Sequence, residues 1–273
     1  MRILLATTFR DLGNKKNKIL QKKFLQSLNN KYANIDLAIR QFGEKNIKEF
    51  IKSNYDGKLF FQNKKNLNFK WSHSVLLDYA LKIFEKNNYD YIVWCSSDLF
   101  FEKEFFKKID SLKFKENTML TFFPNLSNCK NSIVEFGIDI FFFNINNEQS
   151  KKIRILLKKY PNYNWGVFEN FLFSLSDIFN MKIINIRKFV KIFKSNNYRP
   201  INYRKEQVNS WQNNQKKFKK MIYENNLSKL YISGSMYYLA WKMLTLNNLN
   251  FDLVKIYFLL TIKFIFRIFK INI

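Results

Sequence analysis

The sequence predicts an α/β domain in which helices flank a central sheet, followed by a helical extension. Along residues 1–200, short apolar segments of strand length alternate with segments whose apolar residues recur at helical spacing. Beyond residue 200 the pattern is helical and polar without strand alternation, so we expect a main domain at 1–200 and a helical extension at 201–273. Apolar residues make up 47% of the 273 residues, which suffices for one hydrophobic core and excludes a disordered chain.

The first three elements are predicted to be a strand, a helix and a second strand. Residues 2–8 are almost continuously apolar, which is typical of a central strand buried on both faces. Between residues 15 and 30 the apolar side chains are spaced for one face of a helix, and residues 35–39 form the next apolar segment. The polar loop after the first strand would then lie at the edge where open α/β sheets bind their ligands.

A further strand and loop are predicted in the middle of the chain. Ser72 and Ser74 are candidate N-cap residues for a helix whose apolar face continues to Phe84. Residues 91–95 then form a compact apolar strand, and the polar triplet 96–98 comes directly after its carboxyl end. We therefore expect this triplet to lie in a functional loop.

Three helices and three strands complete the predicted domain. Gly137 interrupts the chain before one of the strands, and a turn at 161–164 separates two of the helices. The predicted helices are residues 104–112, 148–159 and 168–179, and the predicted strands are 119–123, 138–145 and 181–186.

The net charge of +26 suggests an anionic partner, but its distribution argues against nucleic acid. Lysine is spread along the whole chain, together with the abundant Asn, Ile and Phe that an AT-rich genome supplies. We therefore expect no nucleic-acid partner and attribute the charge to composition and to attraction to an anionic membrane.

Cys95 and Cys129 lack neighbours at metal-ligand spacing, which excludes a disulfide scaffold and is typical of reduced, cytoplasmic thiols. The apolar part of the N-terminus is too short for a secretory signal.

The sequence YDYIVWCSSD and the segment WGVFEN, about 70 residues later, together resemble the GT-A glycosyltransferases of the family 2 type. The resemblance spans roughly residues 1–190 and implies a Rossmann-like mixed sheet that carries one catalytic site. In that family an Asp-x-Asp motif after a central strand holds Mn²⁺ or Mg²⁺ against the donor diphosphate. The matching triplet is Ser96, Ser97 and Asp98, which implies that Asp98 binds the metal and that Ser96 replaces the first carboxylate. The alternative is that Ser97 and Asp98 only end the strand and cap a helix at 103–109.

The segment WGVFEN resembles a second motif of these enzymes, in which a carboxylate deprotonates the acceptor hydroxyl. Trp165, Gly166 and Glu169 match it, with one extra residue and with Asn170 in the second acidic position. A general base must be ionised near neutral pH, and a helix N-terminus favours an ionised Glu169. The alternative is a structural glutamate in the first turn of a helix. Asp139 resembles an acidic position on the acceptor or donor side, or is a solvated carboxylate at the start of a strand.

The resemblance also implies residues that bind the nucleotide. Thr8, Arg10 and Asp11 follow the first strand, where these enzymes bind the base and ribose, although Arg10 also fits a surface charge. His73 is the only histidine and lies at a helix start. It would either lie near the donor phosphates, where a helix N-terminus holds anionic oxygen, or have a structural or capping role. The two serines of the triplet complete the expected donor site.

Residues 251–273 form a strongly apolar tail that basic residues interrupt. These charges break up the run of about 20 apolar residues that a membrane-spanning helix needs. On a helix they would form one basic stripe on an otherwise apolar surface, which is typical of a helix in the plane of a membrane. The alternative is a terminal helix that packs on the domain or on a second subunit. The basic residues are Lys255, Lys263, Arg267 and Lys270.

Together these features predict a metal-assisted glycosyltransferase, cytoplasmic and peripheral on the inner face of the membrane. It would move a sugar from a nucleoside-diphosphate-sugar donor to a lipid-linked or cell-surface glycan acceptor. Its cofactor would be Mn²⁺ or Mg²⁺, and its third partner an anionic membrane surface. The alternative is a non-catalytic membrane-associated binding or scaffold protein with a degenerate fold, in which Ser96 marks the loss of the metal site.

Overall fold

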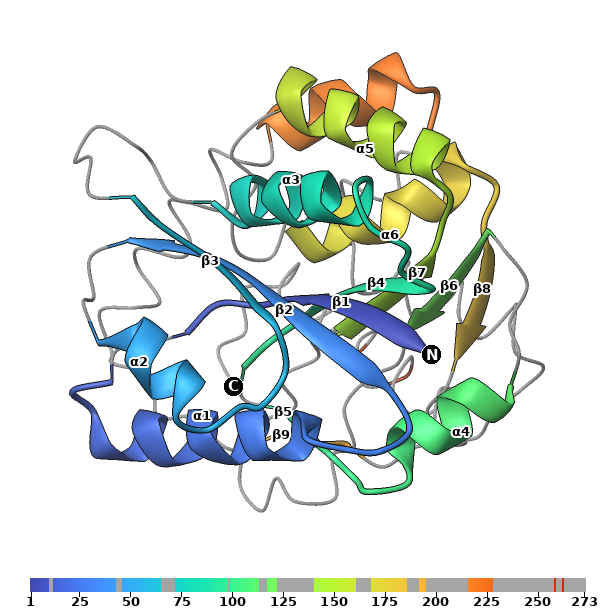
Figure 1. The fold of residues 1–273 in the computed structure, drawn as a ribbon. Helices are drawn as coiled ribbons and strands as arrows, with labels where there is room; N and C mark the ends of the chain where they lie inside the picture. The colour runs from blue at the N-terminus through green and yellow to red at the C-terminus, as the bar shows by residue number, and fades with distance from the viewer. Residues whose placement is uncertain are drawn as a thin grey trace.

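The computed structural model describes residues 1–9, 12–42, 46–64, 72–97, 99–112, 117–121, 140–160, 168–185, 192–194, 216–227, 258 and 262. Within these ranges a seven-stranded sheet has the strand order β3-β2-β1-β4-β7-β6-β8, with helices on both faces (Figure 1). Its strands are β1 (Arg2–Ala6), β2 (Asn34–Phe42), β3 (Leu59–Lys64), β4 (Tyr91–Cys95), β6 (Thr118–Thr121), β7 (Ile140–Asn144) and β8 (Lys182–Asn185). A second sheet pairs β5 (Leu99–Phe101) with β9 (Ile192–Lys194). The helices are α1 (Lys15–Leu28), α2 (Ile47–Lys52), α3 (His73–Phe84), α4 (Phe105–Ser111), α5 (Asn147–Lys159), α6 (Phe168–Ile178) and a further helix at 216–224.

The large sheet is mixed, as the sequence predicts. β3, β2, β1 and β4 run parallel to one another, and β7 is antiparallel to both of its neighbours. β6 and β8 run parallel to each other, in the same direction as β4. β4 is buried along its whole length, because helices cover both faces of the sheet at its centre.

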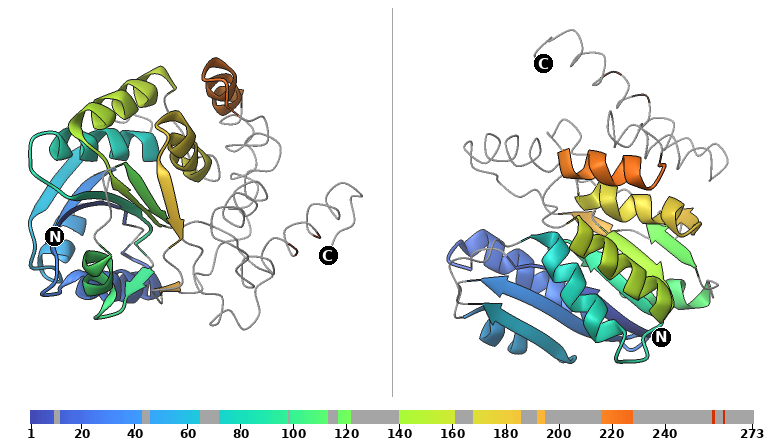
Figure 2. Two further views of the ribbon diagram at one scale, coloured as in Figure 1. Left: turned by 90° about the vertical axis from the view of Figure 1, so that its right-hand side faces the viewer. Right: turned by 90° about the horizontal axis from the view of Figure 1, so that it is seen from above.

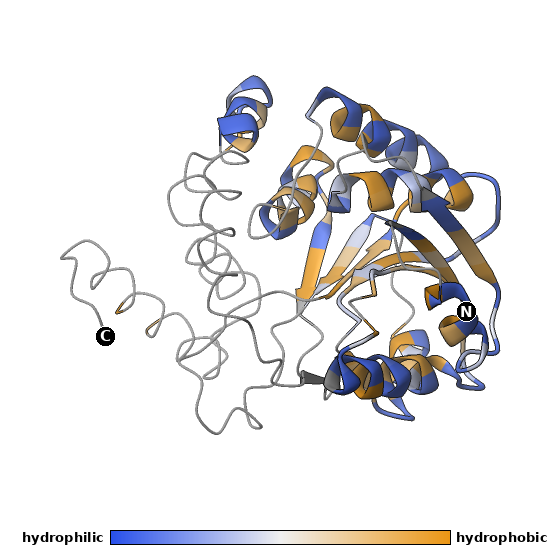
Figure 3. Cartoon of the chain, turned by 90° about the vertical axis from the view of Figure 1, so that its left-hand side faces the viewer, coloured by the Kyte–Doolittle hydropathy of each residue, from blue (hydrophilic) through white to orange (hydrophobic). Residues whose placement is uncertain are grey.

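Two hydrophobic clusters, one on each face of the sheet, hold the layers together. Successive residues of β1 point to opposite faces, so Leu4 and Ala6 belong to the first cluster while Ile3 and Leu5 belong to the second. Helices α3, α5, α6 and 216–224 cover the first face, and α1, α2 and α4 cover the second (Figures 1 and 2). Figure 3 shows apolar residues on the sheet and on the inner sides of the helices, with polar residues outside.

The sequence pattern does not predict α2, β3 or β5. α2 has six residues and β5 has three, which is too short for hydrophobic periodicity to be detected. β3 lies at the edge of the sheet and is only partly buried, so it lacks a continuous apolar run. The N-cap residue of α4 is Glu104, so Ser97 does not cap that helix, whereas Asp98 lies outside the described residues.

The 216–224 helix packs on the domain that precedes it. Its apolar side chains are buried in the first cluster together with those of α6. Glu224 accepts a hydrogen bond from the Tyr160 hydroxyl and forms an ion pair with Lys159, whose Nζ lies 2.9 Å from the carboxylate. The buried side chains are Phe218, Met221 and Ile222.

Most of the predicted extension, 201–273, lies outside the described residues. In the tail, 251–273, only Phe258 and Ile262 are described, both with helical backbone. The domain boundary near residue 200 and the membrane-surface tail therefore stay predictions. Among the helices that the structure describes, none is both long and apolar enough to cross a membrane.

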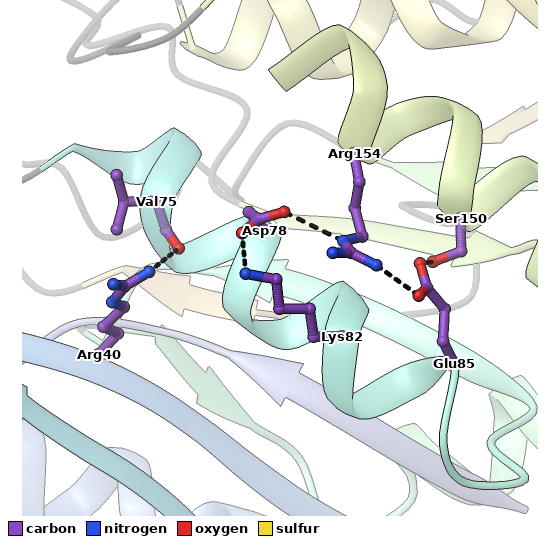
Figure 4. Close-up of polar contacts among 7 residues, drawn as sticks. All are labelled: Arg40, Val75, Asp78, Lys82, Glu85, Ser150 and Arg154. Atoms are coloured by element: carbon purple, nitrogen blue, oxygen red, sulfur yellow. Dashed lines mark hydrogen bonds and ion pairs between the residues drawn. The ribbon is translucent and has the colours of Figure 1, made fainter. Parts of the chain in front are cut away.

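Side chains of α3 and α5 form an ion-pair network between the two helices (Figure 4). The Arg154 guanidinium donates hydrogen bonds to Asp78 at 3.0 Å and to Glu85 at 2.5 Å. The Ser150 hydroxyl donates to the Glu85 carboxylate at 3.0 Å, and the Lys82 ammonium lies 2.9 Å from Asp78. The side chains of Arg154, Asp78 and Glu85 are 13% to 18% exposed, so water screens these pairs only partly. The network fixes α3 relative to α5.

Replacing Arg154 with leucine would leave the largely buried Glu85 carboxylate without its cation and Asp78 with Lys82 alone. Arg154→Leu should therefore lower the free energy of unfolding, measured by urea denaturation, by about 2–4 kcal/mol. Lys152→Gln is a matched control on the same helix, because its pair with Glu148 is exposed, and it should leave stability unchanged. Equal losses for the two variants would contradict a stabilising role of the network.

Candidate functional site

Two polar loops leave the sheet at the carboxyl ends of its parallel strands. Thr8 follows β1, and Ser96 and Ser97 follow β4. β1 and β4 are adjacent and parallel, with Ala6 opposite Trp94 in their register. Both loops therefore lie at the same edge, as the sequence predicts.

Two helices begin at this edge as well. α3 connects the parallel strands β3 and β4, so it starts at their carboxyl ends and runs back across the sheet. Its N-cap residue is Ser72, whose side chain accepts a hydrogen bond from the Val75 N–H at 3.3 Å, as predicted. α6 precedes β8, which runs in the direction of β4, so α6 also starts at the carboxyl edge.

Three buried rings join these elements and are called the aromatic cluster below. The His73 ring of α3 stacks on Phe168 of α6, with ring centroids 5.2 Å apart, and meets Trp94 of β4 edge-on at 5.5 Å. The Trp94 and Phe168 centroids lie 5.3 Å apart. Glu169 directly follows Phe168, and Ser96 lies two residues after Trp94. The aromatic cluster therefore brings the loop after β4 and the first turn of α6 together.

His73 has the environment of a packing residue. It is 5% exposed, and burial lowers its pKa to about 3, so the ring is neutral at physiological pH. A neutral imidazole between two aromatic rings adds no positive charge that would attract a phosphate. These observations favour the structural alternative, and phosphate binding by His73 stays a prediction.

The loop after β1 is held by a side chain of β2. The Phe9 N–H donates to Oε1 of Gln41 at 3.3 Å, and Nε2 of Gln41 donates to the Phe9 carbonyl at 3.0 Å. Gln41 is buried, so water competes little for either bond. The pair fixes the backbone between Thr8 and the predicted nucleotide-binding residues Arg10 and Asp11. Gln41 is not among the residues predicted for the site, and its signal in the sequence is a polar residue at the end of an apolar strand.

The described polar groups at this edge include hydroxyls and one carboxylate. Glu169 lies in the first turn of α6, where the helix dipole favours its ionised form, and its Oε2 atom is buried. Ser97 is buried and Ser96 is partly exposed. Oxygen atoms are the ligands that Mn²⁺ and Mg²⁺ prefer, so these residues fit a hard cation. In the described ranges, no three His, Cys, Asp or Glu side chains are grouped to hold a metal ion.

The predicted site residues divide into two groups. At the carboxyl edge of the sheet the structure places Thr8, His73, Ser96, Ser97 and Glu169. Outside the described residues lie Arg10, Asp11, Asp98 and Asp139, together with Trp165 and Gly166. The roles of both groups in binding and catalysis stay predictions.

A cavity of about 1100 Å³ lies at the opposite edge of the sheet. Arg2, residues 34–36 and residues 55–58 line it, at the beginnings of β1, β2 and β3. The Asp36 carboxylate there already accepts a hydrogen bond from the Tyr89 hydroxyl at 2.6 Å. Ligands of open α/β sheets bind at the carboxyl ends of the strands, so we assign the candidate site to the carboxyl edge.

Comparison with solved structures identifies the fold. A mannosyltransferase from Pyrobaculum calidifontis, in complex with GDP-Man and Mn²⁺, matches with a TM-score of 0.52 at 11% sequence identity. The match covers 90% of this chain and 72% of the mannosyltransferase. The chain has a GT-A-like fold. This confirms the fold class that the motifs after β4 and before α6 imply.

Two further structures are less similar. The glycosyltransferase GlyE of Streptococcus pneumoniae has a TM-score of 0.39 at 14% identity; the match covers 68% of this chain and 45% of GlyE. A 4-diphosphocytidyl-2C-methyl-D-erythritol synthase from Anaerococcus prevotii has a TM-score of 0.41 at 14% identity, with 78% and 96% covered. No protein-family model matches the sequence, and no curated protein is similar to it in sequence.

Burial of His73 predicts a specific acid sensitivity. An unfolded histidine titrates near 6.5, whereas the pKa in the folded chain is about 3, so the unfolded state binds the proton first. Proton binding by the unfolded state therefore lowers the free energy of unfolding as the pH falls. The loss begins near pH 6.5 and continues toward pH 3, at about 1.4 kcal/mol per pH unit. His73→Phe keeps a ring but cannot titrate. Between pH 7 and pH 5, urea denaturation should show about 2 kcal/mol more loss for the wild type than for His73→Phe. Parallel losses would contradict a buried neutral His73.

Removal of the Gln41 side-chain amide should free the loop after β1. Gln41→Leu keeps a similar volume but loses both hydrogen bonds to Phe9, so amide exchange at residues 7–9 should accelerate about tenfold. Hydrogen-deuterium exchange with mass spectrometry measures this directly. Gln62→Leu, the same change on the edge strand β3, is the control and should leave that loop unaffected. Unchanged exchange in Gln41→Leu would show that other contacts hold the loop.

Proposed function

We propose that the chain is a metal-assisted glycosyltransferase that uses a nucleoside-diphosphate-sugar donor. The supporting observation is the convergence at one sheet edge of the loop after β4, the loop after β1 and the first turn of α6. The aromatic cluster joins two of these segments across more than seventy residues of sequence, from Trp94 to Phe168. In a GT-A-like fold this edge is where a donor would bind.

The donor would bind between the loops that follow β1 and β4. Thr8, Arg10 and Asp11 would contact the base and ribose, and Gln41 holds the backbone of Phe9, which follows Thr8. Asp98, with the hydroxyls of Ser96 and Ser97, would hold Mn²⁺ or Mg²⁺, which would neutralise charge on the departing diphosphate. The mannosyltransferase with GDP-Man and Mn²⁺ supports this class of donor and metal.

Glu169 would act as the general base. Its carboxylate would accept the proton of the acceptor hydroxyl as that oxygen attacks the anomeric carbon and the bond to the donor diphosphate breaks. The positive end of the α6 helix dipole would favour the ionised form of this carboxylate. Direct displacement of this kind inverts the anomeric configuration. Asp139 would orient the acceptor or the donor.

The acceptor would be a lipid-linked or cell-surface glycan, reached from the inner face of the membrane. The basic apolar tail at 251–273 supports this placement by its sequence. Ser96 favours a second function, because it removes one of the two carboxylates of the metal motif. In that case the chain would be a membrane-associated binding or scaffold protein without activity.

Substitutions of the two proposed acidic groups test the assignment. Glu169→Gln and Asp98→Asn should each lower kcat/KM for glycosyl transfer about a hundredfold or more, because each removes a group that acts in the reaction. Glu148→Gln, in an exposed pair on α5, is the control and should leave activity intact. Full activity in both site variants would refute the roles given to Glu169 and Asp98.

Nucleotide binding separates the enzyme from the scaffold. A panel of nucleoside diphosphates, each with and without Mn²⁺, should raise the melting temperature for one base, and only with the metal. The rise should be absent in Asp98→Asn and retained in Glu169→Gln, since only the former contacts the metal. A chain whose melting temperature responds to no nucleotide would be a scaffold.

A further inference from the structure

The outer surfaces of α5 and the 216–224 helix carry an unusual concentration of lysine. Both helices lie on the same side of the sheet, in its outer layer (Figures 1 and 2). Their described, exposed basic side chains are called the lysine face below. Only Glu148 and Glu224 oppose them on the same two helices. The lysine face consists of Lys151, Lys152, Lys158, Lys159, Lys216, Lys217, Lys219 and Lys220.

Most of this charge is not neutralised within the described part of the chain. Lys152 pairs with Glu148, and Glu224 is shared by Lys159 and Lys220. The other five lysines form no ion pair with a described residue. Two glutamates against eight lysines leave the surface strongly positive, and a surface of this kind attracts an extended anionic partner.

Each helix also exposes one large apolar side chain near its lysines. Ile155 is 62% exposed, and Tyr223 is 49% exposed. Ile155 lies four residues after Lys151 and three before Lys158, so the three share one side of α5. Tyr223 lies three residues after Lys220, on the side of the 216–224 helix opposite its buried residues. Single exposed apolar residues are common, but here both lie next to exposed lysines of the same helix.

We propose that the lysine face docks on an anionic lipid bilayer. Lysine ammonium groups would lie at the level of the lipid phosphates, and Ile155 and Tyr223 would enter the boundary between headgroups and acyl chains. Nucleic acid fits less well, because a phosphate backbone offers no apolar layer to receive Ile155. The proposal depends neither on glycosyl transfer nor on the tail at 251–273.

The placement has a geometric consequence for the candidate site. The 216–224 helix shares the first hydrophobic cluster with α6 through Phe218, Met221 and Ile222, and α6 begins at Phe168, directly before Glu169. A bilayer on the lysine face would therefore lie beside the carboxyl edge of the sheet. That position suits an acceptor that is held in the membrane.

α1 offers the matched control, because it lies on the opposite side of the sheet (Figure 1). Its surface also has exposed lysines around one exposed apolar residue, Ile19. A bilayer cannot touch both sides of the sheet at once, and α1 has half as many described exposed lysines as the lysine face. The exposed lysines of α1 are Lys15, Lys18, Lys22 and Lys23.

The test uses the full chain and flotation with vesicles. One variant changes Lys158, Lys216, Lys217 and Lys219 to Gln, and the control changes Lys15, Lys18, Lys22 and Lys23 to Gln. The vesicles are pure phosphatidylcholine, or phosphatidylcholine with one third phosphatidylglycerol. Wild type should bind only the anionic vesicles. At about fivefold per lysine, the lysine-face variant should bind them at least a hundredfold more weakly, and the α1 variant within tenfold of wild type. Unchanged melting temperatures show that both variants are folded.

A third variant tests the apolar contribution. Ile155→Ser should weaken binding to anionic vesicles about tenfold and should leave binding to a generic DNA duplex unchanged. Equal losses in the two lysine variants, or a larger loss in the α1 variant, would overturn the proposal. So would a lysine-face variant that loses DNA binding and keeps its vesicle binding, since the face would then be a nucleic-acid surface.

Discussion

The packing of His73 between Phe168 and Trp94 is the constraint on which the candidate site depends. These rings come from α3, β4 and α6, and their contact sets the position of the first turn of α6 relative to the loop after β4. Paired aromatic rings contribute about 0.5–1.5 kcal/mol each beyond their buried area. The histidine must remain neutral to be buried, so the same contact that builds the edge makes it sensitive to acid.

α3 is held at more than one point along its length. Its start packs in the aromatic cluster, and the carbonyl of Val75 accepts a hydrogen bond from Arg40 of β2 at 3.4 Å (Figure 4). Farther along, Arg154 of α5 joins Asp78 and Glu85. A helix fixed by rings at one end and by ion pairs along its middle and far end can present its N-terminus with little motion, which is what a binding site requires.

The sequence predicts this fold well where burial is complete and poorly where it is partial. β1 and β4 are central and continuously apolar, so their pattern is unambiguous, and the polar residues that follow them indicate the functional edge. β3 is a half-buried edge strand, and α2 and β5 are too short to show a period.

The side-chain contacts that join the segments of the site could not be predicted from the sequence pattern. Gln41 contacts Phe9 across 32 residues, and the contact of Trp94 with Phe168 spans still more, so neither leaves a local pattern in the sequence. The motifs indicate which residues lie at the edge. Only the tertiary packing shows that Glu169 and the serines after β4 come to the same place.

The positions of the lysines in the fold indicate a function for the charge that the sequence alone does not indicate. A net charge of +26 spread along a sequence indicates composition as readily as function. On the folded chain, eight exposed lysines lie with Ile155 and Tyr223 on two helices of one side, next to the helix that carries Glu169. A protein held on a surface meets an acceptor anchored in the same surface at a raised effective concentration, so it needs little affinity for the acceptor itself. The lysine face would thus contribute to turnover without contacting the substrate.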